Sequence, residues 1–226
     1  MGSGPALQEV FGVPPGVKDY SYVDRGNLDS RLAYALSTKR HVIIHGDSKQ
    51  GKTWLRQQAL AGCDVVYVQC QADATPASIF TELLGCLGVK AQLKQTTKSD
   101  LQGTLDLSGS GEIGIKLLSR FKVGVKAGAK GARSTQMEVA PIGQTAADLG
   151  WVAAAIAESG RRVVIEDFHY LHEASRKDFA FLLKALGEYG VFPVIVGVWP
   201  QDHLLTYYNG DLSGRVEDLH LSALLS

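Results

Sequence analysis

One short segment constrains the fold of this chain more than any other, because it fits the pattern Gly-x4-Gly-Lys-Ser/Thr. The segment is Gly46-Asp47-Ser48-Lys49-Gln50-Gly51-Lys52-Thr53. A Val- and Ile-rich run, His41 to His45, precedes it, and a helical pattern from Thr53 to Ala61 follows. Glycines let consecutive N–H groups point at one anion, a lysine neutralises terminal phosphate groups, and a hydroxyl reaches Mg²⁺. The segment therefore predicts a strand, a phosphate-binding loop and a helix in direct succession, with Trp54 as the last nucleotide contact.

The rest of the sequence alternates apolar runs with helical patterns. The further apolar runs are Val65 to Cys70, Val163 to Ile165, Phe192 to Trp199 and Val216 to Leu221. All but the last lack alternation, which is typical of strands buried on both faces, whereas the last alternates and suits a sheet edge. The helical patterns cover Leu28 to Leu36, Pro76 to Leu87, Thr145 to Glu158 and Ser175 to Tyr189. This succession predicts an α/β fold with a parallel sheet and helices on both faces.

Length and composition exclude several classes of protein. The chain has 226 residues with 45% hydrophobic and 20% charged residues, which suits one globular α/β domain with an insertion. Its longest apolar stretch, Val191 to Trp199, is far shorter than the roughly 20 residues of a membrane helix. The three cysteines have no Cys-x-x-Cys spacing, which favours a reducing compartment. We therefore expect a soluble, cytoplasmic protein without a membrane partner.

The zero net charge hides a basic insertion from Lys90 to Arg133. This stretch holds nine of the 23 basic residues and three of the 23 acidic ones, a net of +6 that the remainder balances with −6. It is also rich in glycine, with seven glycines between Gly103 and Gly131. We interpret residues 90–140 as a Gly-rich basic insertion, either a weakly specified β-hairpin or a mobile segment. Its charge makes nucleic acid a candidate partner.

Two acids follow the apolar run from Val163 to Ile165. Glu166 and Asp167 would project from the carboxyl end of a buried strand, where open α/β sheets bind ligands. Beside a phosphate loop, one acid can hold Mg²⁺ and the other can polarise the attacking water. We assign Glu166, together with Thr53, to the metal ion and Asp167 to the water, although the two roles could be exchanged.

These motifs together resemble those of the P-loop ATPases of the AAA+ and STAND group, in particular bacterial STAND-type ATPases. The resemblance implies a five-stranded parallel sheet of order 5-1-4-3-2, with ATP and Mg²⁺ as ligands. Tyr22-Val23-Asp24-Arg25 resembles the motif that the group places near the adenine, which implies nucleotide contacts for Tyr22 and Arg25. Arg215 precedes the fifth strand, where the group often carries an arginine that reaches the γ-phosphate of a neighbouring subunit, so the resemblance also implies self-association.

The chain departs from the pattern of this group in two places. The acids stand in the order Glu-Asp instead of Asp-Glu, and the end of the fourth strand, Gly197-Val198-Trp199, offers no polar side chain to place the water. Both departures indicate slow hydrolysis. The helical lid that follows the fifth strand in the group has no counterpart before Ser226. We therefore expect residues 1–19 to be a tag or linker, 20–222 the ATPase core, and 223–226 a truncation point.

The sequence predicts an ATP-binding, slowly hydrolysing switch domain of a larger signalling or defence protein, with an ATPase reaction that yields ADP and phosphate. Two alternatives stay open. One is an AAA+ motor or loader that contacts DNA through the basic insertion. The other is a non-catalytic scaffold in which the nucleotide is structural.

Overall fold

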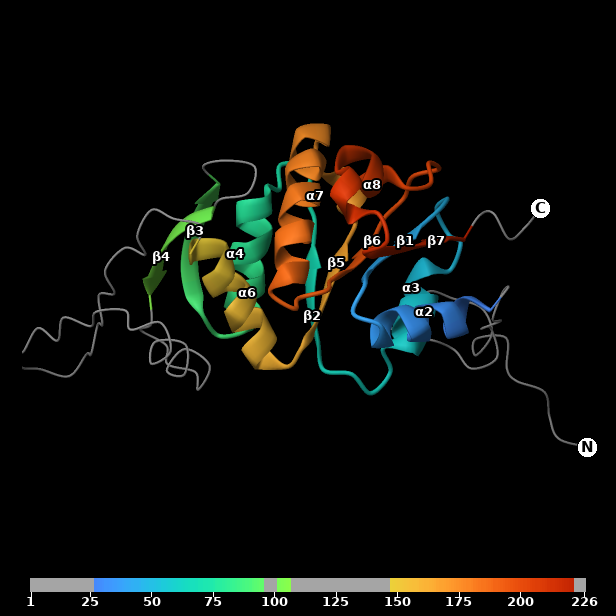
Figure 1. Ribbon diagram of the computed structural model, residues 1–226, viewed down its shortest axis with the longest axis horizontal. Coiled ribbons are helices and arrows are strands. Elements are labelled where there is room, and N and C mark those ends of the chain that lie inside the picture. The colour runs from blue at the N-terminus through green and yellow to red at the C-terminus, as the bar shows by residue number, and fades with distance from the viewer. Residues whose placement is uncertain (1–26, 96–100, 107–146, 222–226) are drawn as a thin grey trace, which may run out of the picture.

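The structure, a computed structural model, describes residues 27–95, 101–106 and 147–221 (Figure 1). Five parallel strands form its main sheet in the order β2-β5-β6-β1-β7. The strands are β1 (His41–His45), β2 (Val65–Gln69), β5 (Arg162–Glu166), β6 (Val194–Val196) and β7 (Val216–His220). If these five strands are numbered 1 to 5 along the chain, their order is 2-3-4-1-5. This is the predicted order 5-1-4-3-2 read from the opposite edge. The predicted fold is confirmed, and the alternating strand β7 lies at an edge.

Helices cover both faces of this sheet. One face carries α2 (Leu28–Ser37) and α3 (Lys52–Ala59), which lie together in Figure 1. The other face carries α4 (Pro76–Cys86), α6 (Ala147–Ser159) and α7 (Glu173–Glu188). Three shorter pieces complete the described part: η1 (Phe168–Tyr170), α8 (Leu204–Tyr208) and η2 (Gly210–Leu212).

Strand pleating divides the apolar side chains into two cores. Ile43, Ile165 and Ile195 point into the core beneath α4, α6 and α7. Their neighbours along the strands, such as Val42 and Val164, point into the core beneath α2 and α3. Successive strand residues face opposite sides, so a strand between two helical layers must be apolar throughout. All five residues of β1 are accordingly buried.

Strand β6 is shorter than the apolar run around it. It spans Val194–Val196, although the sequence predicts a strand from Phe192 to Trp199. Pro193 has no N–H to donate, but its carbonyl accepts from Val42 N at 3.2 Å. At the other end, the indole ring of Trp199 lies over Gly197. Glycine is required there because a Cβ would overlap Cζ3 of Trp199 and lie 2.8 Å from Cε3.

A separate antiparallel hairpin begins directly after α4. Strands β3 (Lys90–Gln95) and β4 (Leu101–Asp106) pair so that Lys90 lies opposite Asp106. Figure 1 shows the hairpin beside α4 and α6, away from the phosphate loop side of the sheet. A hairpin thus forms at the start of the predicted insertion, whereas residues 107–140 lie outside the described residues. So do the predicted linker at 1–19 and the predicted truncation point at 223–226.

No helix in the described ranges combines the length and the apolar character that crossing a lipid bilayer requires.

The contact between Gly197 and Trp199 generates a prediction about stability. Gly197→Ala forces the indole ring to move and should lower the free energy of unfolding by about 1–3 kcal/mol, as overpacking does. Gly85→Ala is the matched control, because this helical glycine has open space around it. The control should stabilise the protein by about 0.5–1 kcal/mol. Urea unfolding of both variants measures the difference, and equal effects would contradict the proposed contact.

Candidate functional site

The loop between β1 and α3 turns at residues with left-handed backbone conformations. Gly46 has a φ of 131°, Lys49 of 63° and Gly51 of 79°. Gly51 is also the residue that caps the start of α3, so the helix begins at Lys52. A loop of this kind followed by a helix N-terminus presents backbone N–H groups to an anion. The local geometry therefore has the elements that the sequence predicts for a phosphate loop.

Lys52 lies inside this loop. Its ammonium donates to the carbonyl of Gly46 at 3.1 Å and to the carbonyl of Asp47, and only 8% of the residue is exposed. Burial lowers the pKa of Lys52, while the Asp47 carboxylate acts in the opposite direction. The lysine is thus a buried cation whose hydrogen-bond partners belong to the loop itself.

The other predicted loop residues differ in their accessibility. Gly46 is buried, whereas the loop residues Asp47, Ser48 and Lys49 are exposed, as is Thr53 in the first turn of α3. Gln50, Gly51 and Trp54 are partly buried. The Thr53 side chain is therefore accessible at the helix N-terminus, where the sequence predicts a metal ligand. Tyr22 and Arg25 lie outside the described residues.

The two predicted acids meet different partners at the carboxyl end of β5. Glu166 is the last residue of the strand, and Asp167 follows it with a left-handed φ of 55°. Gln69, at the end of the neighbouring strand β2, donates to Asp167 Oδ2 at 2.7 Å. The turn at Asp167 thus sends the two carboxylates to separate environments, of which Asp167 has the more polar one.

Arg56 is a site residue that the sequence does not reveal. This residue of α3 is buried, and its Nε lies 2.5 Å from Glu166 Oε1 in an ion pair that lacks the alignment of a hydrogen bond. Its guanidinium also lies 4.8 Å from the ring centroid of Tyr67, in cation–π contact. Burial raises the pKa of Glu166, the Asp167 charge raises it further, and Arg56 counteracts both. Arg56 therefore favours the ionised form of a partly buried carboxylate and connects α3 with β5.

His169 connects the acids with the lysine of the loop. Burial lowers the pKa of His169, and the positive charges of Lys52 and Arg176 act in the same direction, whereas Asp167 opposes them. These charged groups are therefore close enough to interact at the carboxyl edge of the sheet. His169 is thus influenced by Asp167, by Lys52 of the loop and by Arg176 of α7.

Arg215 lies at the amino ends of the parallel strands, whereas the loop follows the carboxyl end of β1. The Arg215 carbonyl accepts from His41 N at 3.0 Å, at the start of β1. The side chain is half-exposed and lies 3.8 Å from Glu188 Oε1. The structure does not bring Arg215 to the predicted phosphate loop of its own chain.

No protein-family model matches the chain, and neither does any curated protein. Among solved structures, it is similar to a STAND protein with a tetratricopeptide repeat sensor from Pyrococcus horikoshii. That match has 15% identity and a TM-score of 0.49, and covers 92% of this chain and 24% of the other.

Two further solved structures are similar. The Walker-type ATPase of Pyrococcus abyssi has 14% identity and a TM-score of 0.48 over 93% of this chain and 56% of that one. Cdc6p from Pyrobaculum aerophilum has 15% identity and a TM-score of 0.38 over 88% and 47%. This chain spans between about a quarter and about half of the length of these proteins.

The Arg56–Glu166 ion pair generates a prediction with a defined pH dependence. Arg56→Gln leaves Glu166 without its compensating charge and should cost about 3 kcal/mol at neutral pH, as for other broken buried pairs. The variant raises the folded-state pKa of Glu166 further above its ordinary value. The variant is therefore most stable at low pH, where Glu166 is protonated. Its free energy of unfolding falls as the pH rises through the folded-state pKa of Glu166.

The difference between wild type and Arg56→Gln should therefore grow from below pH 4.5 to neutral pH in denaturant titrations. Arg161→Gln is the control, because it breaks an exposed pair with Asp64 and should cost less than about 1 kcal/mol. A pH-independent loss in Arg56→Gln would contradict the assigned role of Arg56.

Proposed function

We propose that this chain is an ATP-binding domain that hydrolyses ATP slowly and acts as a nucleotide-dependent switch. The observation that carries the proposal is the buried Lys52 ammonium, held within a left-handed glycine loop at the N-terminus of α3. A buried cation beside free helix N–H groups is a site for a strongly negative ligand, and a triphosphate matches it. The polyanion would take over hydrogen bonds that Lys52 makes to the loop carbonyls.

The residues around Lys52 fit Mg²⁺ as well. The exposed Thr53 hydroxyl and the carboxylate of Glu166 are oxygen donors of the kind that Mg²⁺ prefers, and when bound the ion would neutralise phosphate charge. Glu166 must share its charge between this ion and Arg56. Asp167, which accepts from Gln69, is oriented separately and is proposed to accept the proton of the attacking water.

The environment after β6 supports slow turnover. In place of a polar side chain that could orient water, Trp199 is buried against Phe168 at a ring-centroid distance of 6.2 Å. Slow hydrolysis would make the ATP-bound state long-lived, which suits a switch better than a motor. Self-association, with Arg215 reaching the nucleotide of a neighbour, is part of this proposal.

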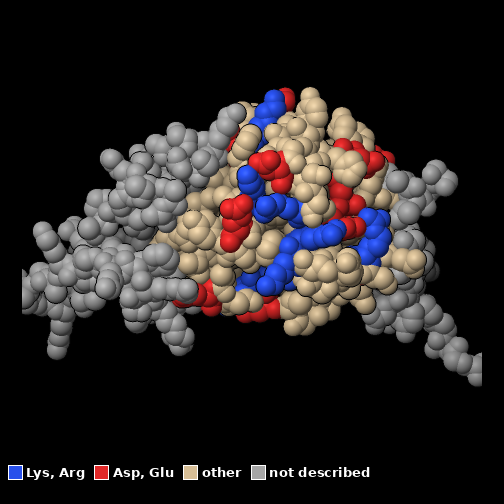
Figure 2. All heavy atoms as spheres, in the orientation of Figure 1, with Lys and Arg blue, Asp and Glu red and all other residues tan. Residues whose placement is uncertain are grey.

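The rival functions depend on other parts of the chain. On the face in Figure 2, Lys and Arg side chains form a band across the middle of the described part, and Asp and Glu side chains lie beside it. The side chains of the basic insertion lie outside the described part of the structure, so DNA binding stays a prediction. A scaffold with structural nucleotide would bind ATP but release no phosphate.

Replacement of the loop lysine tests the binding part of the proposal. Lys52→Ala removes the cation from the loop and should weaken ATP binding by about 10- to 150-fold, since hydrogen bonds to charged groups contribute about 1.5–3 kcal/mol. Titration calorimetry measures the affinity. Lys177→Ala, on the exposed surface of α7, is the matched control. Unchanged ATP affinity in Lys52→Ala, with an intact far-ultraviolet spectrum, would refute the phosphate-loop assignment.

Replacement of the two acids tests hydrolysis and separates their roles. Asp167→Asn should bind ATP normally and release phosphate at least about 100-fold more slowly, as expected for loss of a general base. Glu166→Gln should instead raise the Mg²⁺ concentration needed for ATP binding. If the two phenotypes are exchanged, the roles of the acids are exchanged too. If the wild-type protein binds ATP but releases no phosphate, the function of a non-catalytic scaffold replaces the proposed function of a switch.

A further inference from the structure

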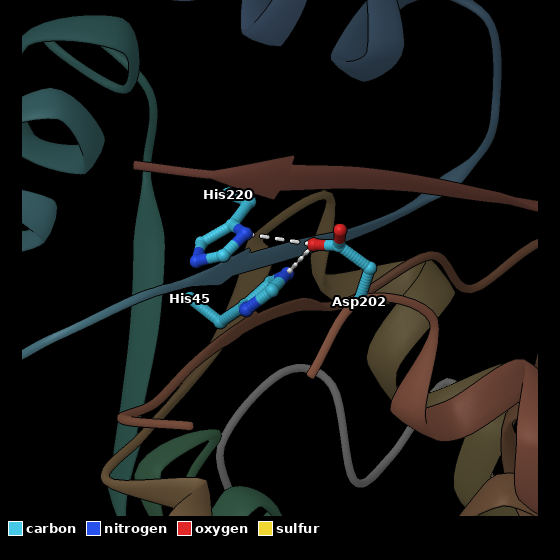
Figure 3. A group of neighbouring side chains, drawn as sticks. All are labelled: His45, Asp202 and His220. Carbon is cyan, nitrogen blue, oxygen red and sulfur yellow. Dashed lines mark ion pairs between the residues drawn. The ribbon is translucent and has the colours of Figure 1, made fainter. Parts of the chain in front are cut away.

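A second group of ionisable side chains lies at the carboxyl ends of β1 and β7, and nothing in the proposed ATPase chemistry uses it. His45 and His220 are paired across the two strands, and their imidazole rings stack at a centroid distance of 4.5 Å. Figure 3 shows the Asp202 carboxylate approaching both rings. Asp202 Oδ1 lies 2.8 Å from His220 Nδ1 and 3.6 Å from His45 Nε2. One donor atom from each residue lies within 4.8 Å of the others.

Asp218 contacts the cluster from within β7. Its Oδ1 lies 2.5 Å from His45 Nε2, and its side chain is 8% exposed. The other oxygen, Oδ2, accepts from the backbone N–H of His203 at 2.8 Å, which fixes the orientation of the carboxylate. A fixed carboxylate beside a histidine is a common supporting group of metal sites.

The tautomer of His45 is fixed by its other nitrogen. His45 Nδ1 lies 3.1 Å from the carbonyl of Trp199, which can only accept, so Nδ1 carries a proton. In a neutral imidazole, the lone pair is then on Nε2, which points at the carboxylates of Asp218 and Asp202. A histidine that donates one N–H to a backbone carbonyl and turns its other nitrogen to a charged site has the arrangement found in metal ligands.

The interior of the cluster contains polar atoms without aligned hydrogen bonds. His45 Nε2, Asp218 Oδ1 and His220 Nδ1 are all buried, and each is close to a carboxylate oxygen or an imidazole nitrogen without hydrogen-bond geometry. His45 itself is fully buried. Buried polar atoms normally have partners. A cation between His45 Nε2 and His220 Nδ1 would satisfy both nitrogens at once.

We propose that His45, Asp202 and His220 bind a divalent metal ion, with Zn²⁺ as the ion that these donors fit best. Two imidazole nitrogens and one carboxylate, with water in the fourth position, are a donor set that zinc accepts in tetrahedral sites. Metal–ligand distances of about 2.0–2.2 Å place tetrahedral donors roughly 3.3 Å from one another. The separations of 2.8 and 3.6 Å between Asp202 Oδ1 and the two imidazole nitrogens lie on either side of this value, and all three donors lie within 4.8 Å of one another, so small side-chain shifts complete the site.

The charges of the cluster balance those of the ion. Two carboxylates beside two neutral imidazoles carry a charge of −2, which a divalent cation cancels. Burial lowers the pKa of His45, but the carboxylates of Asp218 and Asp202 and the carbonyl of Trp199 together raise it above its ordinary value. The field that attracts a proton to His45 also attracts a metal ion, and the half-exposed Asp202 is where the ion would enter.

The site is distinct from the one proposed for nucleotide and Mg²⁺. In the sheet order, β7 lies on one side of β1, whereas β5 with Glu166 lies two strands away on the other side. His45 nevertheless directly precedes Gly46, so a metal ion would hold the strand end from which the phosphate loop begins. Zinc binding does not depend on the proposed ATPase function, and failure of one leaves the other standing.

Zinc titration of the full chain tests this inference. The protein is treated with chelator, freed of it, and titrated with Zn²⁺ alone, without nucleotide or Mg²⁺, against a chromophoric competitor. We expect one Zn²⁺ per chain and, after replacement by Co²⁺, the intense visible absorption of a tetrahedral site. Asp202→Asn and His220→Gln should each weaken Zn²⁺ binding at least about tenfold, the lower end of the cost of disturbing a metal's ligand environment.

Matched variants exclude other sources of zinc binding. Asp73→Asn and His172→Gln replace the same residue types at exposed positions and should leave the affinity unchanged. Cys63→Ser/Cys86→Ser removes the two exposed thiols and should do the same. Zn²⁺ should raise the unfolding temperature of wild type and of these controls, but not of the two cluster variants. Absence of stoichiometric Zn²⁺ binding, or equal affinity in cluster and control variants, overturns the inference and leaves a proton as the partner of His45.

Discussion

The position of strand β1 determines where the groups at the carboxyl ends of the parallel strands lie. This strand is hydrogen-bonded to parallel neighbours on both sides, β6 and β7, and each of its residues is buried. Such a strand cannot slip by one residue without turning its apolar side chains into the wrong core. The position of Gly46 is therefore fixed to within one residue, and with it the start of the loop and of α3. Because β5 runs parallel, its acids arrive at the same edge.

Charged groups at this edge are stabilised by near neighbours and not by solvent. Lys52 donates to loop carbonyls, Arg56 lies against Glu166, and His45 lies against Asp218. In surroundings of low dielectric constant, each pairing determines the protonation of its members more strongly than it would on the surface. The three pairings lie along one edge, so a change in charge at one of them alters the electrostatic setting of the others.

Most of the fold follows from the sequence, because local patterns specify it. The run from His41 to His45 becomes β1 with the predicted bounds, and Pro76 begins α4 after a capping box between Thr75 and Ser78. The turn from Gly46 to Gly51 at the start of α3 is equally local. By contrast, the short β6 depends on how Trp199 folds back over Gly197, which is a tertiary contact that no pattern in the run predicts.

The supporting residues of the site could not be predicted for the same reason. Arg56 reads as an ordinary polar residue of α3, and its partner Glu166 is distant along the chain. His45 and His220 lie at the ends of two strands that become neighbours only in the folded sheet, and Asp202 comes from a loop between β6 and α8. Spacing along the chain reveals a site when one segment supplies it, and fails when several segments each supply one residue.

The hydrogen bonds from Lys52 to its own loop have a consequence for how tightly this protein can hold any anion. The lysine is already desolvated and paired, so a ligand gains only the difference between two bonded arrangements of the same ammonium. Little conformational entropy is lost, because the side chain is ordered in advance. The affinity of such a loop depends on how much better the lysine binds the ligand than it binds the loop carbonyls. Substitutions that strengthen the hydrogen bonds between Lys52 and these carbonyls would therefore weaken ligand binding without contacting the ligand.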